Sequence, residues 1–269
     1  MKISVFFSHA RTASEQEKLP LENILQKVRR MGYHGLEESI DFLLPRSGEL
    51  LPPVKDAGLE FSSLYTMQHF EQGFDETAIL KMLDAMPRFS CRKLMVVPGY
   101  FTQEHLQEVE WARVIDAMSF TCEAAEERGV TVSVENFGNA ASPCFNLDRL
   151  MYLTEQVPSL KYTFDTGNFY FAQENALDAF HQLSSRLVHV HLKDYNKTPR
   201  VPEEAENHDR GNGIEAYPAP IGGGILPIRD YMQAILATGY NDYLCVEQFA
   251  CANQLKDMEA SIQFVRSLL

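Results

Sequence analysis

Residues 188–194 read Val-His-Val-His-Leu-Lys-Asp, a run in which aliphatic and polar side chains alternate. Because successive side chains of a β-strand point to opposite faces, the aliphatic residues share one face, and His189, His191 and Lys193 share the other. An aliphatic face packs against helices, so the imidazoles must point into an interior that other strands also face. This stretch therefore predicts a buried strand with a polar inner face.

Three further stretches repeat the pattern, and each carries a carboxylate at its end. They are Val-Ser-Val-Glu-Asn at 132–136, Thr-Phe-Asp-Thr-Gly-Asn at 163–168 and Leu-Cys-Val-Glu-Gln at 244–248. The carboxylates are Glu135, Asp165 and Glu247. A buried carboxylate or imidazole costs several kcal/mol unless it is paired or ligated. Four such strand ends therefore predict one shared metal site.

The donor set favours a hard divalent cation. Two Glu, one Asp and one His make an oxygen-rich set with one nitrogen, which suits Mn²⁺ best, with Mg²⁺ or Co²⁺ as alternatives. A structural zinc site would be expected to contain Cys. Because only one such set is visible, we expect one metal per chain.

On both sides of these stretches, predicted strands alternate with amphipathic helical segments. Gly32, Gly58, Gly129 and Gly239 each stand between a helical segment and the next strand, where a left-handed helix cap is expected. Eight strands are predicted, at 3–7, 35–38, 60–65, 93–97, 130–135, 161–165, 187–191 and 243–247. Helices are predicted near 15–31, 46–57, 75–89, 104–128, 146–157, 171–185, 226–238 and 254–268. Eight such units predict an α/β fold, a single (β/α)₈ TIM barrel that forms one domain over residues 1–269.

Composition narrows the class of partner. The chain of 269 residues has a formal net charge of −13, which argues against binding nucleic acid or an anionic membrane. No apolar run approaches the roughly 18 residues of a membrane span, and the apolar part of the N-terminus is too short for a signal peptide. Five Cys without paired spacing indicate reduced thiols and a cytoplasmic location. A homo-oligomer is left open.

A long connection follows the seventh strand. Residues 195–226 are rich in Pro, Gly, Asn and charge, and loops of this length are uncommon unless they are functional. Since the connection leaves the strand end beside the predicted metal, we interpret it as a cover over the substrate. Gly222-Gly223-Gly224 within it is interpreted as a tight turn, with a phosphate cradle as the alternative.

Polar residues at the ends of the first strands are candidates for substrate contact. They are His9, Glu37, Tyr65 and His69.

The motifs at the ends of the last four predicted strands resemble those of a known family. Glu-Asn after strand five, Asp-Thr-Gly after strand six, His-Leu-Lys-Asp after strand seven and Val-Glu in strand eight resemble the xylose-isomerase-like superfamily. The resemblance is strongest to its sugar phosphate isomerase/epimerase branch, which includes ketose 3-epimerases and inosose dehydratases. Residues 35–37 and 220–224 also fit, so the similarity spans the whole barrel.

The resemblance implies a ligand set and a catalytic pair. The metal ligands would be Glu135, Asp165, His191 and Glu247, and Glu135 and Glu247 would also be the acid and base. His191 matches the ligand because it stands two residues before Lys193, whereas His189 lies one layer deeper and is a candidate for substrate contact or for a satisfied interior position.

The neighbouring polar residues receive roles around this set. Lys193 is expected to face the substrate, and Asp194 to anchor a neighbouring group rather than bind substrate. Many members have His three residues after the strand-six Asp, where it contacts a substrate hydroxyl. Here the residue is Asn168, which can hydrogen-bond but cannot titrate near pH 7.

The chemistry expected of two carboxylates across a metal is proton transfer next to a carbonyl through an enediolate. The leading hypothesis is a metal-dependent isomerase or epimerase that acts on a sugar or sugar phosphate. A lyase that uses the same enolisation, such as an inosose-type dehydratase or a deglycosidase of oxidised glycosides, is the alternative. An endonuclease-IV-like repair enzyme ranks below both, because it needs three metals and a basic face. A non-catalytic sugar-binding barrel does not explain the two carboxylates.

Overall fold

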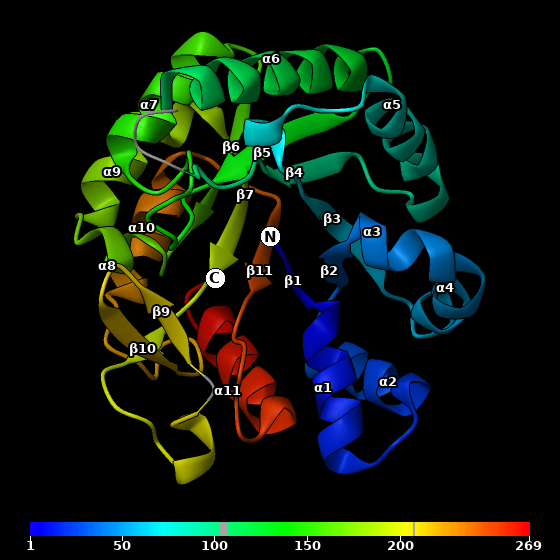
Figure 1. Ribbon diagram of the computed structural model, residues 1–269. Helices are drawn as coiled ribbons and strands as arrows, with labels where there is room; N and C mark the ends of the chain where they lie inside the picture. The colour runs from blue at the N-terminus through cyan, green and yellow to red at the C-terminus, as the bar shows by residue number, and fades with distance from the viewer. Residues whose placement is uncertain (103–106, 207) are drawn as a thin grey trace.

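The structure is a computed structural model that describes residues 1–102, 107–206 and 208–269, and its centre is a closed barrel of eight parallel strands (Figure 1). The barrel order is β1, β11, β7, β6, β5, β4, β3 and β2. The strands are β1 (Lys2–Phe6), β2 (Gly35–Ser39), β3 (Glu60–Met67), β4 (Lys93–Val97), β5 (Thr131–Glu135), β6 (Lys161–Asp165), β7 (Leu187–Leu192) and β11 (Tyr243–Val246). The predicted (β/α)₈ barrel is confirmed.

Helices surround the barrel and cover the aliphatic faces of its strands (Figure 1). They are α1 (Phe7–Glu17), α2 (Leu21–Met31), α3 (Ile40–Leu43), α4 (Ser47–Asp56), α5 (Glu76–Ala85), α6 (Gln107–Glu126), α7 (Leu147–Gln156), α8 (Phe169–Ala172), α9 (Ala176–Leu183), α10 (Ile228–Ala237) and α11 (Gln254–Arg266). The first part of the helix predicted at 104–128 lies outside the described residues.

Two predicted helices are each divided in the structure. The segment 15–31 is the end of α1 followed by α2, because Lys18 takes a left-handed conformation with φ 53° and Pro20 precedes α2. The segment 171–185 is α8 and α9, separated where Gln173 has φ 56°. In the sequence, the helical periodicity runs through both breaks. Periodicity does not report the backbone conformation of a single residue, so neither break could be predicted from it.

Glycine caps end several helices as predicted. Gly32 has φ 108°, and its backbone N–H donates to the carbonyl of Arg29 at the end of α2. Only a residue without Cβ adopts this conformation at little cost, so the chain turns there into β2. The other three predicted caps also have positive φ, at Gly58, Gly129 and Gly239.

Strand register brings the polar strand ends to one end of the barrel. Asp165 of β6 pairs with His191 of β7, and His191 pairs on its other side with Cys245 of β11. Glu135 of β5 pairs with Thr163, which stands two residues before Asp165 in β6 and faces the same side of the strand. Because parallel strands end at the same edge, the side chains that follow them meet above the interior.

The long connection 195–226 forms a small sheet of its own. Strands β8 (Tyr195–Asn196), β10 (Ile214–Pro218) and β9 (Asp209–Gly211) pair antiparallel in the order β8, β10, β9, and we call this sheet the cap. Strand β9 lies beside α8 (Figure 1), where Asn212 Nδ2 donates to the carbonyl of Phe171 at 3.2 Å. The cap therefore sits at the end of the barrel that holds the polar strand ends. Residue 207 of the connection lies outside the described residues.

Asp194 fastens the far end of this connection to the barrel. Its carboxylate accepts from the backbone amides of Tyr195, Gly222, Gly224 and Leu226 at 2.9–3.1 Å. Asp194 thus anchors the chain segment 222–226, in line with the anchoring role predicted for it. These contacts also correct the phosphate alternative, because the amides of Gly222 and Gly224 already donate to a buried carboxylate.

We expect Asp194→Ala to lower the free energy of unfolding by about 3 kcal/mol, because several buried amides lose their acceptor at once. Hydrogen exchange of segment 222–226 should accelerate most, and exchange measured by mass spectrometry checks this. Asp116→Ala on the exposed face of α6 is the control, with a change within about 0.5 kcal/mol. Unchanged protection of 222–226 in Asp194→Ala would contradict the anchoring role.

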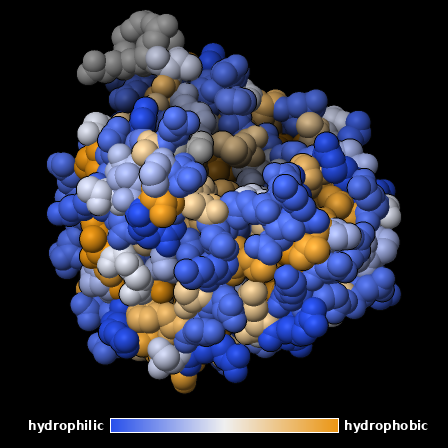
Figure 2. Space-filling view, turned by 90° about the horizontal axis from the view of Figure 1, so that it is seen from below, coloured by the Kyte–Doolittle hydropathy of each residue, from blue (hydrophilic) through white to orange (hydrophobic). Residues whose placement is uncertain are grey.

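The surface carries hydrophilic residues over most of the face in Figure 2, with hydrophobic residues in small groups. Across the described ranges, no helix combines the length and apolar character needed to cross a membrane.

Candidate active site

Four side chains converge at the carboxyl end of the barrel. Glu135 and Asp165 close β5 and β6, His191 is in β7, and Glu247 follows β11 directly. One potential ligand atom from each lies within 4.8 Å of those from the other three, and all four residues are buried. The structure thus brings together the set that the sequence predicted.

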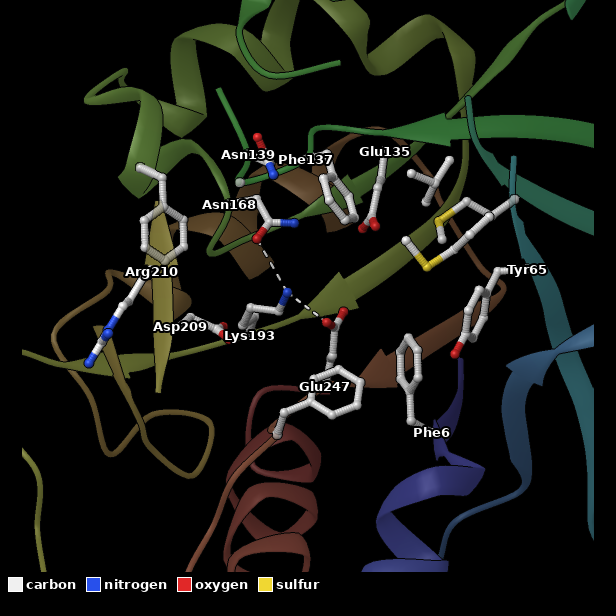
Figure 3. A pocket seen from close by; sticks show the side chains of 16 residues that line it. Phe6, Tyr65, Glu135, Phe137, Asn139, Asn168, Lys193, Asp209, Arg210 and Glu247 are labelled. Carbon is white, nitrogen blue, oxygen red and sulfur yellow. Dashed lines mark hydrogen bonds and ion pairs between the residues drawn. The ribbon is translucent and has the colours of Figure 1, made fainter. Parts of the chain in front are cut away.

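His191 lies between the two Glu side chains. Its Nδ1 is 3.0 Å from Glu135 Oε2 and 3.2 Å from Glu247 Oε2. The carboxylates of Glu135 and Glu247 point toward one another across the cavity (Figure 3). Lys193 Nζ completes the group, at 2.6 Å from Glu247 Oε1 and 3.2 Å from Asp165 Oδ2.

A turn built from the Asp-Thr-Gly-Asn sequence holds Asp165 in place. Asp165 Oδ1 accepts from the backbone amides of Gly167 and Asn168 at 2.7 and 2.8 Å. Asn136 then fixes the backbone of Asp165 from the neighbouring strand, donating to its carbonyl at 2.8 Å and accepting from its amide at 3.0 Å. Both asparagines thereby restrain the carboxylate from which the site is built.

Burial and mutual repulsion shift the acids of this group in different directions. Burial, together with the charges of Glu247 and Glu135, raises the pKa of Asp165 to about 7 against the opposing effect of Lys193. Burial also raises the pKa of Glu135. For Glu247, burial acts in the same direction, but Lys193 and His191 outweigh it and lower the pKa to about 2.

The donor set fits a divalent cation. Asp165 Oδ2 and Glu247 Oε2 are buried without a hydrogen-bond partner, although Lys193 and His191 lie 3.2 Å away without hydrogen-bond geometry. Unpartnered buried carboxylate oxygens are costly, and a bound cation would satisfy them. Three carboxylates and one imidazole favour Mn²⁺, Mg²⁺ or Co²⁺ and also accommodate Zn²⁺.

A cavity of about 370 Å³ opens above this group (Figure 3). Glu135, Glu247, Lys193 and Asn168 line its polar floor. Aromatic and aliphatic side chains form most of the wall, namely Phe6, Tyr65, Met67, Met95, Val97, Phe137, Phe171 and Phe249. Such a wall suits the apolar face of a sugar or cyclic polyol ring.

The cap adds Asp209 and Arg210 to the cavity wall, and no pattern in the sequence pointed to either residue (Figure 3). Asp209 Oδ2 accepts from the hydroxyl of Tyr195 at 2.7 Å. The only signal in the sequence was the length of the connection, because neither residue belongs to a periodic pattern.

Several predicted substrate contacts take other positions. Glu37 and His189 are fully buried below the four-residue group and do not line the cavity, and His189 thus lies in the deeper interior layer expected for it. His69 has a side chain that is 67% exposed, contacts Glu71 and also stands outside the cavity lining. His9 is buried, accepts from the amide of Gln248, and burial lowers its pKa to about 3.

A second group of possible ligands lies close to the first. Glu37, His189 and Cys245 form a second buried group of possible metal-binding residues among the described parts of the chain. Burial alone would raise the pKa of Glu37, but His191 and His189 outweigh burial and hold it well below the ordinary range. This second group lies directly beneath the first, since Glu37 also contacts His191.

Comparison with known proteins identifies the class to which this fold and site belong. The family described as xylose isomerase-like TIM barrel matches residues 20–268, and the chain belongs to this family. An inosose dehydratase from Lacticaseibacillus casei is 23% identical over 255 residues, which cover 86% of this chain and 83% of that enzyme.

Solved structures share the fold at lower identity. A D-psicose 3-epimerase from Clostridium cellulolyticum H10, solved with D-tagatose, superposes with a TM-score of 0.72 at 17% identity and covers 100% of this chain and 99% of its own. The IOLI protein, solved with a bound zinc atom, has a TM-score of 0.74 at 16% identity and covers 100% and 98%. At these identities the likeness establishes the fold alone.

Proposed function

We propose that this chain is a divalent-metal-dependent enzyme that removes a proton next to the carbonyl of an unphosphorylated polyhydroxy ketone and then eliminates water. The observation that carries the proposal is the pair of buried carboxylates, Glu135 and Glu247, which face one another across the cavity (Figure 3). Similarity to inosose dehydratases over most of both chains supports elimination over the isomerase hypothesis.

The two carboxyls take different roles. Glu247 is ionised beside Lys193, so it accepts the proton from the carbon next to the carbonyl. The electrons of that C–H bond form a C=C bond, and the carbonyl oxygen takes the negative charge. Glu135 donates a proton to the β-hydroxyl as the carbonyl re-forms, and water leaves to give an α,β-unsaturated ketone.

The metal would be held by Glu135, Asp165, His191 and Glu247. When bound, a divalent cation supplies the positive charge that polarises the carbonyl and favours the enolate. Asn168 and Lys193 are proposed to orient substrate hydroxyls from the cavity floor, since Lys193 Nζ also lies 3.3 Å from Asn168 Oδ1.

The cavity supports a neutral substrate. Its cationic lining residues are Lys193, whose ammonium group is occupied by Glu247 and Asp165, and the exposed Arg210, which lies 3.5 Å from Glu215. Among the described lining residues these two are the only Lys or Arg side chains, so a phosphate would find no free buried cation.

The second candidate is an epimerase or isomerase, in which Glu135 returns a proton to the same carbon from the opposite side or to its neighbour. The facing arrangement of the two carboxylates favours it, because proton removal and return on opposite faces require groups on both sides of the substrate.

A screen of inososes, ketoses and oxidised glycosides in D₂O distinguishes the two candidates. Both predict deuterium at the carbon next to the carbonyl in recovered substrate, because a carboxylate exchanges its proton with solvent. Elimination adds release of water and an absorbance of the conjugated ketone, whereas epimerisation gives a product of unchanged composition. Turnover without any deuterium uptake would contradict proton transfer by Glu135 and Glu247.

A further inference from the structure

A fully buried carboxylate joins the two histidines of β7. Glu37 of β2 has 0% exposure, and its Oε2 and Oε1 lie 2.7 Å from His189 Nε2 and 3.1 Å from His191 Nε2. The two imidazole rings stand nearly perpendicular, with centroids 5.3 Å apart. Each oxygen of Glu37 therefore faces one imidazole nitrogen.

His191 has a different kind of partner on each side of its ring. Nε2 faces Glu37, whereas Nδ1 faces Glu135 and Glu247 in the four-residue group. A neutral imidazole carries one N–H and one lone pair, and a metal ligand must present the lone pair. An ionised carboxylate only accepts hydrogen bonds, so Glu37 favours the proton on Nε2 and leaves the lone pair of Nδ1 toward the other carboxylates.

We propose that Glu37 is a positioning residue of the metal centre, which holds His191 in the tautomer and orientation that present Nδ1 to the cation, while His189 holds Glu37 from below. The inference rests on the proposed metal centre. Carboxylates that accept from the second nitrogen of a ligating imidazole orient the ring and raise its basicity, and their loss weakens metal binding by about 10–100-fold.

The same geometry argues against a second metal bound by Glu37, His189 and Cys245. Both oxygens of Glu37 already face imidazole nitrogens, so the carboxylate has no oxygen free for a cation at this depth. His189 Nε2 also faces Glu37, which places this histidine beside the carboxylate that supports His191. The group is therefore interpreted as a support of the site above it.

Glu37→Gln tests the proposal with little change in volume. A carboxamide presents an N–H₂ group as well as an oxygen, and it can donate to His191 Nε2. Donation there would shift the imidazole proton to Nδ1 and occupy the lone pair that the metal needs. We expect the Kd for Mn²⁺, measured by titration of the metal-free protein, to rise by about 10–100-fold. The visible spectrum of bound Co²⁺ should change as well.

Glu38→Gln is the matched control. Glu38 is the next residue of the same strand and is 2% exposed, but its partners are Arg11, Ser39 and Tyr65. Glu38→Gln removes one buried negative charge, as Glu37→Gln does, but contacts neither histidine. The Kd of this variant for Mn²⁺ should therefore stay within about threefold of the wild-type value. Circular dichroism of each metal-free variant verifies the fold.

The outcomes distinguish failure of the metal centre from failure of the positioning role of Glu37. A wild-type protein that binds no metal overturns the metal centre itself. Wild-type protein that binds Mn²⁺, with Glu37→Gln binding it equally well and with an unchanged Co²⁺ spectrum, overturns only the positioning role. Two ions in wild type and one in Glu37→Gln would make Glu37 a ligand, which also overturns it.

If Glu37→Gln does not fold, Glu37→Asp replaces it in the experiment. Aspartate keeps the charge but withdraws the carboxylate by one methylene from both imidazoles, so an intermediate loss of Mn²⁺ affinity supports positioning. An unchanged Mn²⁺ affinity in Glu37→Asp contradicts it.

Discussion

Glu247→Gln is expected to lower turnover by about 10²–10⁴-fold while keeping most of the bound metal. The amide oxygen of glutamine can still act as a ligand, but an amide cannot accept the substrate proton at neutral pH. Lys193 Nζ, 2.6 Å from Glu247 Oε1, favours the ionised form of this carboxylate. Replacing Glu247 by Gln therefore removes the base and leaves the neighbouring ligands in place. Turnover and metal content are measured on the same preparation.

Glu110→Gln is the control for removing a buried acid elsewhere. Glu110 is buried on α6 and accepts from the backbone amide of Thr102, away from the cavity lining. The turnover of the Glu110→Gln variant should stay close to that of the wild-type protein. If Glu247→Gln retained near-normal turnover with normal metal content, Glu247 would have to be withdrawn from the acid–base role.

Asp165→Ala and His191→Ala are expected to lose metal and activity together. Wild-type protein should carry about one divalent ion per chain after mild purification. Removing a direct ligand should reduce metal affinity by more than the roughly 100-fold seen when only the support of a ligand is lost. Asp165 contributes a buried oxygen without a hydrogen-bond partner, and His191 contributes the one nitrogen of the set. Elemental analysis and turnover with added Mn²⁺ check the result.

Asp178→Ala and His181→Ala, on the exposed side of α9, are the corresponding surface controls and should keep both metal and activity. Wild-type protein without metal, and without binding of added Mn²⁺, Mg²⁺ or Co²⁺, would contradict the site. Retention of full metal affinity by His191→Ala would remove His191 from the ligand set and with it the proposed role of Glu37.

The sequence by itself determined the barrel and the convergence of its four polar strand ends. Alternation within a strand states which side chains share a face, and this property is local. In a parallel barrel every strand ends at the same edge, so Glu135, Asp165 and Glu247 had to meet there once the fold was predicted. The four candidate ligands could be named from the sequence because local pattern and fold lead to the same strand ends, and the family resemblance selected His191 over His189.

Tertiary structure decided how deep each inward side chain lies. Alternation already placed His189 one layer below His191, but Glu37 was predicted at the substrate, and the stagger between strands of the closed barrel instead places it against both histidines. The cap residues Asp209 and Arg210 reach the cavity only because β9 pairs with β10. Alternation within one strand cannot report such contacts, because they join segments distant in the sequence and depend on register, closure and the path of a long connection.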